Sequence, residues 1–267
     1  MNHDDIISCE EDDYSMYDLA LETTQSNIIK ILFEVIKDVI LTDINIIFTP
    51  TYIKIEEEGT KDVCMVYLEL DTDKFEKYYC RNSSIIVGIN AFDFYKVIKT
   101  TKGVDTISFF IEKGNNKTFI VKLENSEKEK VTESHINRID VEYNPLGIPE
   151  IEYPEPIVMM SGDFQKIVRD MNTLGVNKNI EITRVGRQII FSYTGDFSKN
   201  KLVFFKNKPN EKFPIISGNF DLKYLMLFIK ATNLSTHIKI YLNNDSALIL
   251  QYEVGTLGSI KLILRYE

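Results

Sequence analysis

The feature that most constrains the fold of this chain is an internal duplication. Residues 94–124 read FYKVIKTTKGVDTISFFIEKGNNKTFIVKLE, and residues 225–253 read LMLFIKATNLSTHIKIYLNNDSALILQYE. In both segments a short apolar helix ends at Ile-Lys-Thr-Thr or Ile-Lys-Ala-Thr, and two alternating strands follow across a polar turn. Because self-similarity at a wide interval marks repeated structural units, the repeat predicts two similar domains.

Each copy also contains an earlier helical pattern, at residues 27–40 and 162–174, with strand-like alternation between its two helices. This order predicts an α+β fold in which two helices of each domain pack on antiparallel β-sheets. A segment rich in Pro, Gly and acidic residues separates the copies and is expected to run extended over the surface. The predicted parts are an acidic disordered extension (1–16), an N-terminal domain (17–138), a linker (139–153) and a C-terminal domain (154–267).

Composition argues against several classes of protein. No apolar run reaches transmembrane length without a charge, and the acidic N-terminus lacks the parts of a secretory signal, so we expect an intracellular protein without a membrane span. Three cysteines without a Cys-x-x-Cys pair argue against a disulfide framework and a zinc site. The isolated His3, His135 and His237, and the lack of a glycine-rich phosphate loop, predict no enzyme, cofactor or metal.

The net charge of -9 opposes general attraction to nucleic acid, so the local placement of cations decides whether the chain binds it. Each predicted helix carries two cations three or seven residues apart, which puts both on one helical face. One such pair is ordinary for a solvated helix. Four pairs in an acidic chain favour a concave surface that meets an anionic polymer without reading its sequence. The pairs are Lys30 and Lys37, Lys96 and Lys99, Lys166 and Arg169, and Lys223 and Lys230.

The segment 146–175 reads LGIPEIEYPEPIVMMSGDFQKIVRDMNTLG and joins the linker to the third predicted helix. It resembles the linker and the following helix of the proliferating cell nuclear antigen family, the DNA sliding clamps. Leu-Gly-Ile-Pro-Glu, Tyr153, Ser161-Gly162, Phe164 and Arg169-Asp170 all fall in register with that family. The resemblance extends from about Met16 to Tyr266 and is strongest in the linker, the third and fourth helices, and residues 96–99.

The resemblance implies a head-to-tail homotrimer, a ring of pseudo-six-fold symmetry around double-stranded DNA with helices inside and sheets outside. Such a clamp is placed by a clamp loader and tethers a DNA polymerase and other replication and repair enzymes. The eight helix cations match the family's DNA-facing positions, and Lys130 joins them. The family is nuclear. High Ile, Asn and Lys usage suggests an AT-rich, viral source, for which a cytoplasmic replication site is the alternative.

The resemblance also implies a pocket for partner peptides under the linker. The matching positions are Val63, Met65, Leu146, Ile148, Pro149 and Tyr153. For Val63 and Met65 the alternative is an ordinary strand core. This chain departs from the family at the pocket edge, where Glu58 replaces an apolar residue and Ile263 replaces an aromatic one. We hypothesise that Glu58 favours basic peptides.

Ring closure is expected to use two edge strands, at residues 128–137 and 199–205. Ser134 stands where relatives often place an aromatic anchor, a loss worth on the order of a few kcal/mol, so the ring is expected to be weak. The residues expected to compensate are Ile136, Met171, Leu174, Leu202 and Phe204. Two alternatives stay open: a monomeric or heterotrimeric clamp-like subunit, and a scaffold that has lost DNA binding. The retained cation pairs argue against the second.

Overall fold

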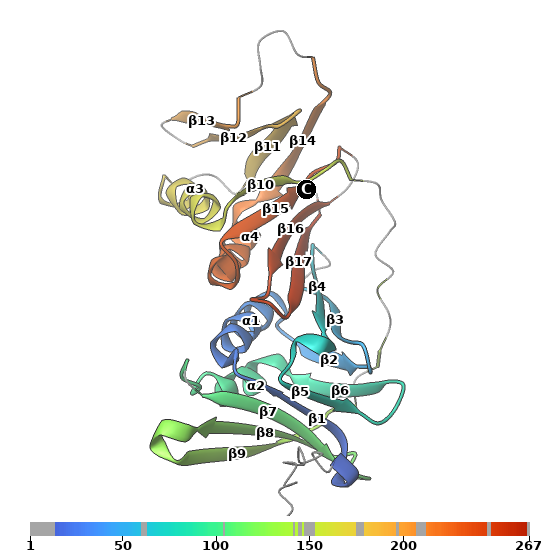
Figure 1. Ribbon diagram of the computed structural model, residues 1–267. Helices are drawn as coiled ribbons and strands as arrows, with labels where there is room; N and C mark the ends of the chain where they lie inside the picture. The colour runs from blue at the N-terminus through green and yellow to red at the C-terminus, as the bar shows by residue number, and fades with distance from the viewer. Residues whose placement is uncertain are drawn as a thin grey trace, which may run out of the picture.

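The computed structural model describes residues 14–59, 63–103, 105–140, 142–143, 146, 153–174, 179–195, 198–206, 212–244 and 247–265. It confirms the predicted α+β class, with helices and antiparallel sheets arranged as two repeats (Figure 1). Residues 1–13 of the predicted extension lie outside the described residues. Tyr14–Met16 form a 3-10 turn (η1), and Tyr14 stacks on Tyr79, so including these three residues in a disordered extension was wrong. Among the described residues no helix is both long enough and apolar enough to cross a membrane.

The two halves repeat the same order of elements. The N-terminal half contains β1 (Tyr17–Thr23), α1 (Ser26–Val39), β2 (Asp43–Phe48), β3 (Tyr52–Glu58), β4 (Cys64–Asp71), η3 (Thr72–Lys74), β5 (Lys77–Cys80), β6 (Ile85–Asn90), α2 (Ala91–Ile98), β7 (Thr106–Glu112), β8 (Thr118–Asn125), η4 (Ser126–Lys128) and β9 (Lys130–Asn137). The C-terminal half contains β10 (Ile157–Met160), α3 (Ser161–Thr173), β11 (Asn179–Val185), β12 (Gln188–Thr194), β13 (Lys199–Phe204), β14 (Ile215–Asp221), α4 (Leu222–Phe228), η5 (Ile229–Leu234), β15 (His237–Tyr241), β16 (Leu248–Glu253) and β17 (Gly258–Leu264).

The strands form three sheets with the orders β5-β1-β7-β8-β9, β10-β15-β16-β17-β4-β3-β2-β6 and β13-β12-β11-β14. The second sheet runs through both halves, because β17 pairs with β4 from Gly258 opposite Leu70 to Leu264 opposite Cys64. Strands β9 and β13 each end a sheet. The two edges predicted to close a ring are therefore edge strands in the described chain.

The helices form a layer on one side of the sheets (Figure 1). Helix α1 forms where Ile29, Leu32, Phe33 and Ile36 recur at helical spacing, and all four side chains are buried. Helices α2 and α4 begin at equivalent caps, since the side chains of Asn90 and Asp221 accept hydrogen bonds from backbone N–H groups of the first turn. Helix α1 packs against both α2 and α4, so one helix layer and one continuous core join the two halves.

Candidate nucleic-acid interface and partner pocket

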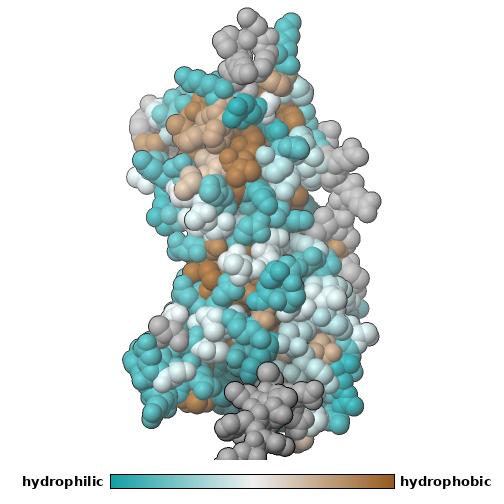
Figure 2. All heavy atoms as spheres, viewed as in Figure 1, coloured by the Kyte–Doolittle hydropathy of each residue, from teal (hydrophilic) through white to brown (hydrophobic). Residues whose placement is uncertain are grey.

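The four helices place their cations on the side of the molecule away from the sheets (Figure 1), and the outline is hollowed on that side (Figure 2). Lys99, Lys166 and Arg169 are exposed and have no acidic partner within the described residues. Lys223 is also exposed, with its Nζ 5.7 Å from the centre of the Tyr224 ring. These four cations are available to an anionic ligand.

The other helix cations already have contacts within the chain. The Nζ of Lys30 donates to the carbonyl of Thr101 at 3.2 Å, which fastens α1 to the loop after α2. Lys96 lies 2.7 Å from Asp93 on its own helix. Lys37 and Lys230 both contact Asp38. The spacing of cations in the sequence predicted their common face, but it did not reveal these partners.

Lys130 begins β9 and is exposed. It lies near Asp105, which precedes β7. Burial alone would raise the pKa of Asp105, but hydrogen bonds from Asn125 and from the Lys102 backbone, with the charges of Lys102 and Lys130, lower it. Lys130 therefore has an anionic neighbour of its own.

A second site lies on the opposite face of the eight-stranded sheet, where the two halves join. The register aligns Glu58, Met65, Ile263, Ile249 and Tyr241 across β3, β4, β17, β16 and β15. Met65, Ile249 and Ile263 form a small apolar cluster separate from the main core. Their neighbours along β4 and β17 face that core instead, as strand alternation requires.

The linker closes over this apolar cluster. Leu146 and Tyr153 pack against it, together with Tyr241 and Ala247. The hydroxyl of Tyr153 donates to the carbonyl of Ala247 at 2.8 Å, and the Tyr153 and Tyr241 rings lie 6.1 Å apart. The structure therefore brings together Met65, Leu146, Tyr153 and Ile263. Ile148 and Pro149 lie outside the described residues.

Two of the predicted pocket residues are placed differently from the rest. Val63 packs against the main core, and its carbonyl accepts a hydrogen bond from the backbone N–H of Arg265 at 2.9 Å. Glu58 lies 3.3 Å from Nη2 of Arg265, so its charge is partly compensated by the end of β17. Any preference for basic peptides must therefore act through a paired carboxylate.

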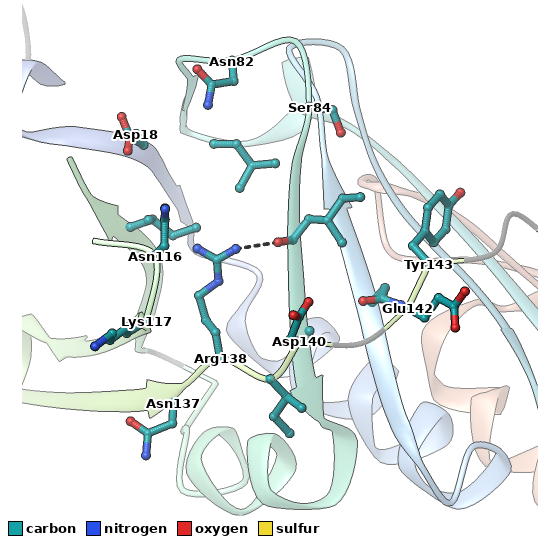
Figure 3. Close-up of a pocket in the computed structure, with 16 residues that line it drawn as sticks. Asp18, Asn82, Ser84, Asn116, Lys117, Asn137, Arg138, Asp140, Glu142 and Tyr143 are labelled. Carbon is teal, nitrogen blue, oxygen red and sulfur yellow. Dashed lines mark hydrogen bonds between the residues drawn. The ribbon is translucent and has the colours of Figure 1, made fainter. Parts of the chain in front are cut away.

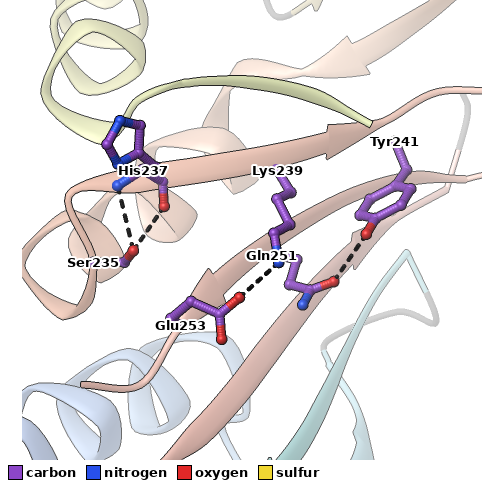
Figure 4. Close-up of polar contacts among 6 residues, drawn as sticks. All are labelled: Ser235, His237, Lys239, Tyr241, Gln251 and Glu253. Atoms are coloured by element: carbon purple, nitrogen blue, oxygen red, sulfur yellow. Dashed lines mark hydrogen bonds and ion pairs between the residues drawn. The ribbon is translucent and has the colours of Figure 1, made fainter. Parts of the chain in front are cut away.

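Sequence reasoning missed Tyr241, Ala247 and Ile249. The outward alternation of Ala247, Ile249 and Gln251 along β16 was the available signal, but only the register with β17 connects it to Ile263. The apolar cluster ends at polar cross-strand contacts (Figure 4): Tyr241 donates to Gln251 at 3.2 Å, and Lys239 lies 2.8 Å from Glu253. These contacts mark the polar border of the pocket.

A polar cavity of about 1000 Å³ lies at the base of the linker (Figure 3). Arg138 crosses it, donating from Nη2 to the carbonyl of Ile86 at 2.6 Å, while the N–H of Ile139 donates to the carbonyl of Gly88. Burial lowers the pKa of Arg138. Tyr143 donates to Glu56 at 3.3 Å. The first residues of the linker are thus fastened to β6 and β3.

The residues predicted for the subunit interface differ in accessibility. Leu202 is 42% exposed on β13, and Ser134, Ile136, Leu174 and Phe204 are partly buried. Met171 is 2% exposed and packs in the core of its own half. It therefore supports α3 from inside and offers no surface in the isolated chain.

Comparison with known proteins gives a consistent family. The model described as "Proliferating cell nuclear antigen, N-terminal domain" matches residues 16–144, and "Proliferating cell nuclear antigen, C-terminal domain" matches residues 147–266. A protein named "Probable DNA polymerase sliding clamp 1" from Paramecium bursaria Chlorella virus 1 is 31% identical over 255 residues, covering 91% of this chain and 95% of that protein. The proliferating cell nuclear antigen of Chaetomium thermophilum is 29% identical, covering 89% and 93%.

A solved structure shows the same fold. The crystal structure of the proliferating cellular nuclear antigen from Entamoeba histolytica superposes with a TM-score of 0.83. It covers 94% of this chain and 100% of that one at 21% sequence identity. The architecture is therefore that of the DNA clamp.

Proposed function

Because this chain belongs to the proliferating cell nuclear antigen family, we propose that it is a replicative sliding clamp that closes as a homotrimer around double-stranded DNA. In this role it is a processivity factor: it holds a DNA polymerase, and repair enzymes, on the template through the pocket under its linker. The role is one of binding rather than catalysis.

The observation that carries this proposal is the pairing of β17 with β4. The duplication makes β9 the counterpart of β17, since Val121 pairs with Ser134 just as its repeat equivalent Leu250 pairs with Leu262. It also makes β13 the counterpart of β4, because Ile53 pairs with Leu70 as Ile189 pairs with Phe204. The two edge strands are thus the two sides of a junction that the chain already forms once within itself.

The same equivalence predicts a register between subunits. Leu262 pairs with Val66 inside the chain, so Ser134 is expected to pair with Asn200 of the next chain. One residue away, Lys261 pairs with Tyr67, so Glu133 is expected to face Lys201. Opposite charges directly across a strand pair are favourable and like charges are not. Head-to-tail pairing of two different edges generates a closed ring when its rotation closes.

A mass measurement with a charge swap tests this assembly. Light scattering behind a sizing column, over a concentration series, is expected to give the mass of three chains. Glu133→Lys and Lys201→Glu are each expected to shift the mass towards one chain, because like charges then meet across the edge. The double variant restores the pair and is expected to recover the ring. A double variant no better than the singles contradicts the register.

We propose that the ring binds DNA through phosphate contacts from Lys99, Lys166, Arg169 and Lys223, supported by Lys30, Lys37, Lys96, Lys130 and Lys230. Their position on one hollowed side of the molecule supports this assignment. Replacing Lys166 and Arg169 with Ala is expected to weaken DNA binding and to flatten its salt dependence by about 0.9 per lost phosphate contact. Lys74→Ala, on a turn outside the four helices, is the matched control.

We propose that partner peptides insert apolar side chains over Met65, Ile249 and Ile263, where Leu146 and Tyr153 of the linker now lie. A short apolar turn fits such a cluster, and the linker supplies main-chain groups beside it. A clamp loader opens the ring in this proposal, and the nucleus or a cytoplasmic viral replication site is its location.

A second candidate is a clamp-like subunit that does not close a ring alone. Its support is chemical: the edge of β9 carries Thr132 and Ser134 where β17 carries the buried Ile260 and Leu262. A mass of one chain at every concentration, with DNA binding retained, favours this candidate.

A further inference from the structure

Asp38 is an acidic residue in the middle of the cationic helix face. It lies in the last turn of α1, and its Oδ1 is 2.6 Å from Nζ of Lys37. Its Oδ2 forms an ion pair with Lys230 of η5, in the other half of the chain. One carboxylate therefore holds two of the cations assigned to DNA.

The environment of Asp38 keeps it charged. Burial alone would raise its pKa, but the hydrogen bonds and charges of Lys230 and Lys37 outweigh burial and lower the pKa below the ordinary carboxyl value of 3.8. A carboxyl pKa lowered by folding stabilises the folded state above that value, and this contribution is lost as the pH falls through the lowered pKa. At neutral pH the carboxylate is ionised and competes with any other anion for Lys37 and Lys230.

This ion pair differs from the other acid–base pair on the helix face. Asp93 and Lys96 have side chains 64% and 51% exposed, and such pairs are weak and easily exchanged. The side chain of Asp38 is only 20% exposed, and that of Lys37 only 13%. Lys37 is further positioned over the Tyr95 ring at 4.8 Å. The arrangement around Asp38 is therefore a built contact rather than a chance surface pair.

We propose that Asp38 is a resident anion that limits how strongly the clamp holds DNA, by occupying two cations that phosphates would otherwise neutralise. This proposal rests on the DNA-binding role proposed above. With Asp38 in place, a phosphate reaching Lys37 or Lys230 displaces a carboxylate, so each contact gains less free energy. Weak, exchangeable contacts allow a ring to move along the duplex.

The test measures the affinity of the full-length protein for a short fluorescent DNA duplex by anisotropy, between about 50 and 200 mM salt. Asp38→Asn keeps the shape of the side chain and removes its charge. Asp73→Asn removes the same charge from an exposed pair on the turn before β5 and is the matched control. Asp38→Glu keeps the charge and is the restoring variant.

Asp38→Asn is expected to bind roughly three- to tenfold more tightly at the lowest salt, with a salt slope steeper by up to about 1.8, since two more phosphate contacts form. Asp73→Asn and Asp38→Glu are expected to match the wild type. A merely structural role lowers the melting temperature of Asp38→Asn and leaves the salt slope unchanged, which overturns the proposal.

The two levels of the proposal fail in different ways. If Asp38→Asn equals the wild type while Lys166→Ala binds more weakly, the DNA-binding role stands and the role of Asp38 falls. If the wild type and every variant bind no duplex at any salt concentration tested, both fall.

Discussion

Strand β17 pairs with β4 inside the chain, whereas its counterpart β9 has no strand on its outer side within the described residues. The inward side chains of β17 at this junction are Ile260, Leu262 and Leu264, all fully buried. The equivalent positions of β9 are Thr132, Ser134 and Ile136. The same backbone arrangement is therefore sealed by apolar burial in one place and left partly polar in the other.

This difference shows what each junction has to do. The β17–β4 junction joins two halves that never separate, so a dry apolar seam costs nothing in function. The proposed β9–β13 junction has to open for DNA to enter, and polar side chains such as Thr132 and Ser134 remain soluble when it is open. Obligate interfaces are accordingly more apolar than those that exchange.

The largest expected effect comes from truncating the intrachain seam. Leu262→Ala removes a fully buried side chain at the β17–β4 junction and is expected to lower the free energy of unfolding by about 2–5 kcal/mol. Its counterpart Ser134→Ala is expected to change the unfolding of the single chain by less than about 0.5 kcal/mol. Urea denaturation of both variants measures the contrast. Equal losses would break the comparison, because they would mean that β9 is sealed within the chain.

A second contrast concerns the close approach of the two strands. Gly258 begins β17, and a Cβ added there would lie 2.2 Å from the carbonyl oxygen of Glu69 and 2.7 Å from Cα of Leu70. Both contacts are with backbone, so Gly258→Ala is expected to cost about 1–3 kcal/mol of stability. The counterpart in β9 is Lys130, already a long side chain. Lys130→Ala is expected to leave the melting temperature unchanged while weakening DNA binding, and thermal melts with binding curves distinguish the two effects.

The two halves also show how far sequence reasoning reached. The duplication, the helix faces and the edge strands followed from period and turn residues, because these patterns are local. The pairing of Asp38 with Lys230 did not follow, since 192 residues separate them and only the packing of α1 on η5 brings them together. The placement of Val63 in the main core also required the strand register: apolar type alone does not say which face of a sheet a residue occupies.

A smaller effect tests whether polarity limits ring closure. Ser134→Leu gives β9 the residue type that β17 carries at the same position, and it is expected to stabilise each contact between subunits by about 1–2 kcal/mol through apolar burial. Light scattering is expected to show the ring persisting at concentrations roughly 5- to 30-fold lower than for the wild type. Ser192→Leu, on a neighbouring strand of the C-terminal half, controls for general stickiness. A Ser134→Leu ring that dissociates at the wild-type concentration would mean that another feature limits closure.

The smallest effect concerns the charged rim where the two halves meet. Glu58 and Arg265 have side chains 35% and 51% exposed, so breaking their pair is expected to cost only about 0–1 kcal/mol of stability. The expected change is in specificity: the wild type prefers a basic peptide over a neutral one of the same apolar sequence, and Glu58→Met loses that preference. Because Arg265 already compensates Glu58, the preference is expected to strengthen in Arg265→Ala, which leaves the carboxylate unpaired. Calorimetric titration of both peptides against the three proteins measures this order, and equal affinities for the two peptides in all three would exclude any role of the Glu58 charge in partner choice.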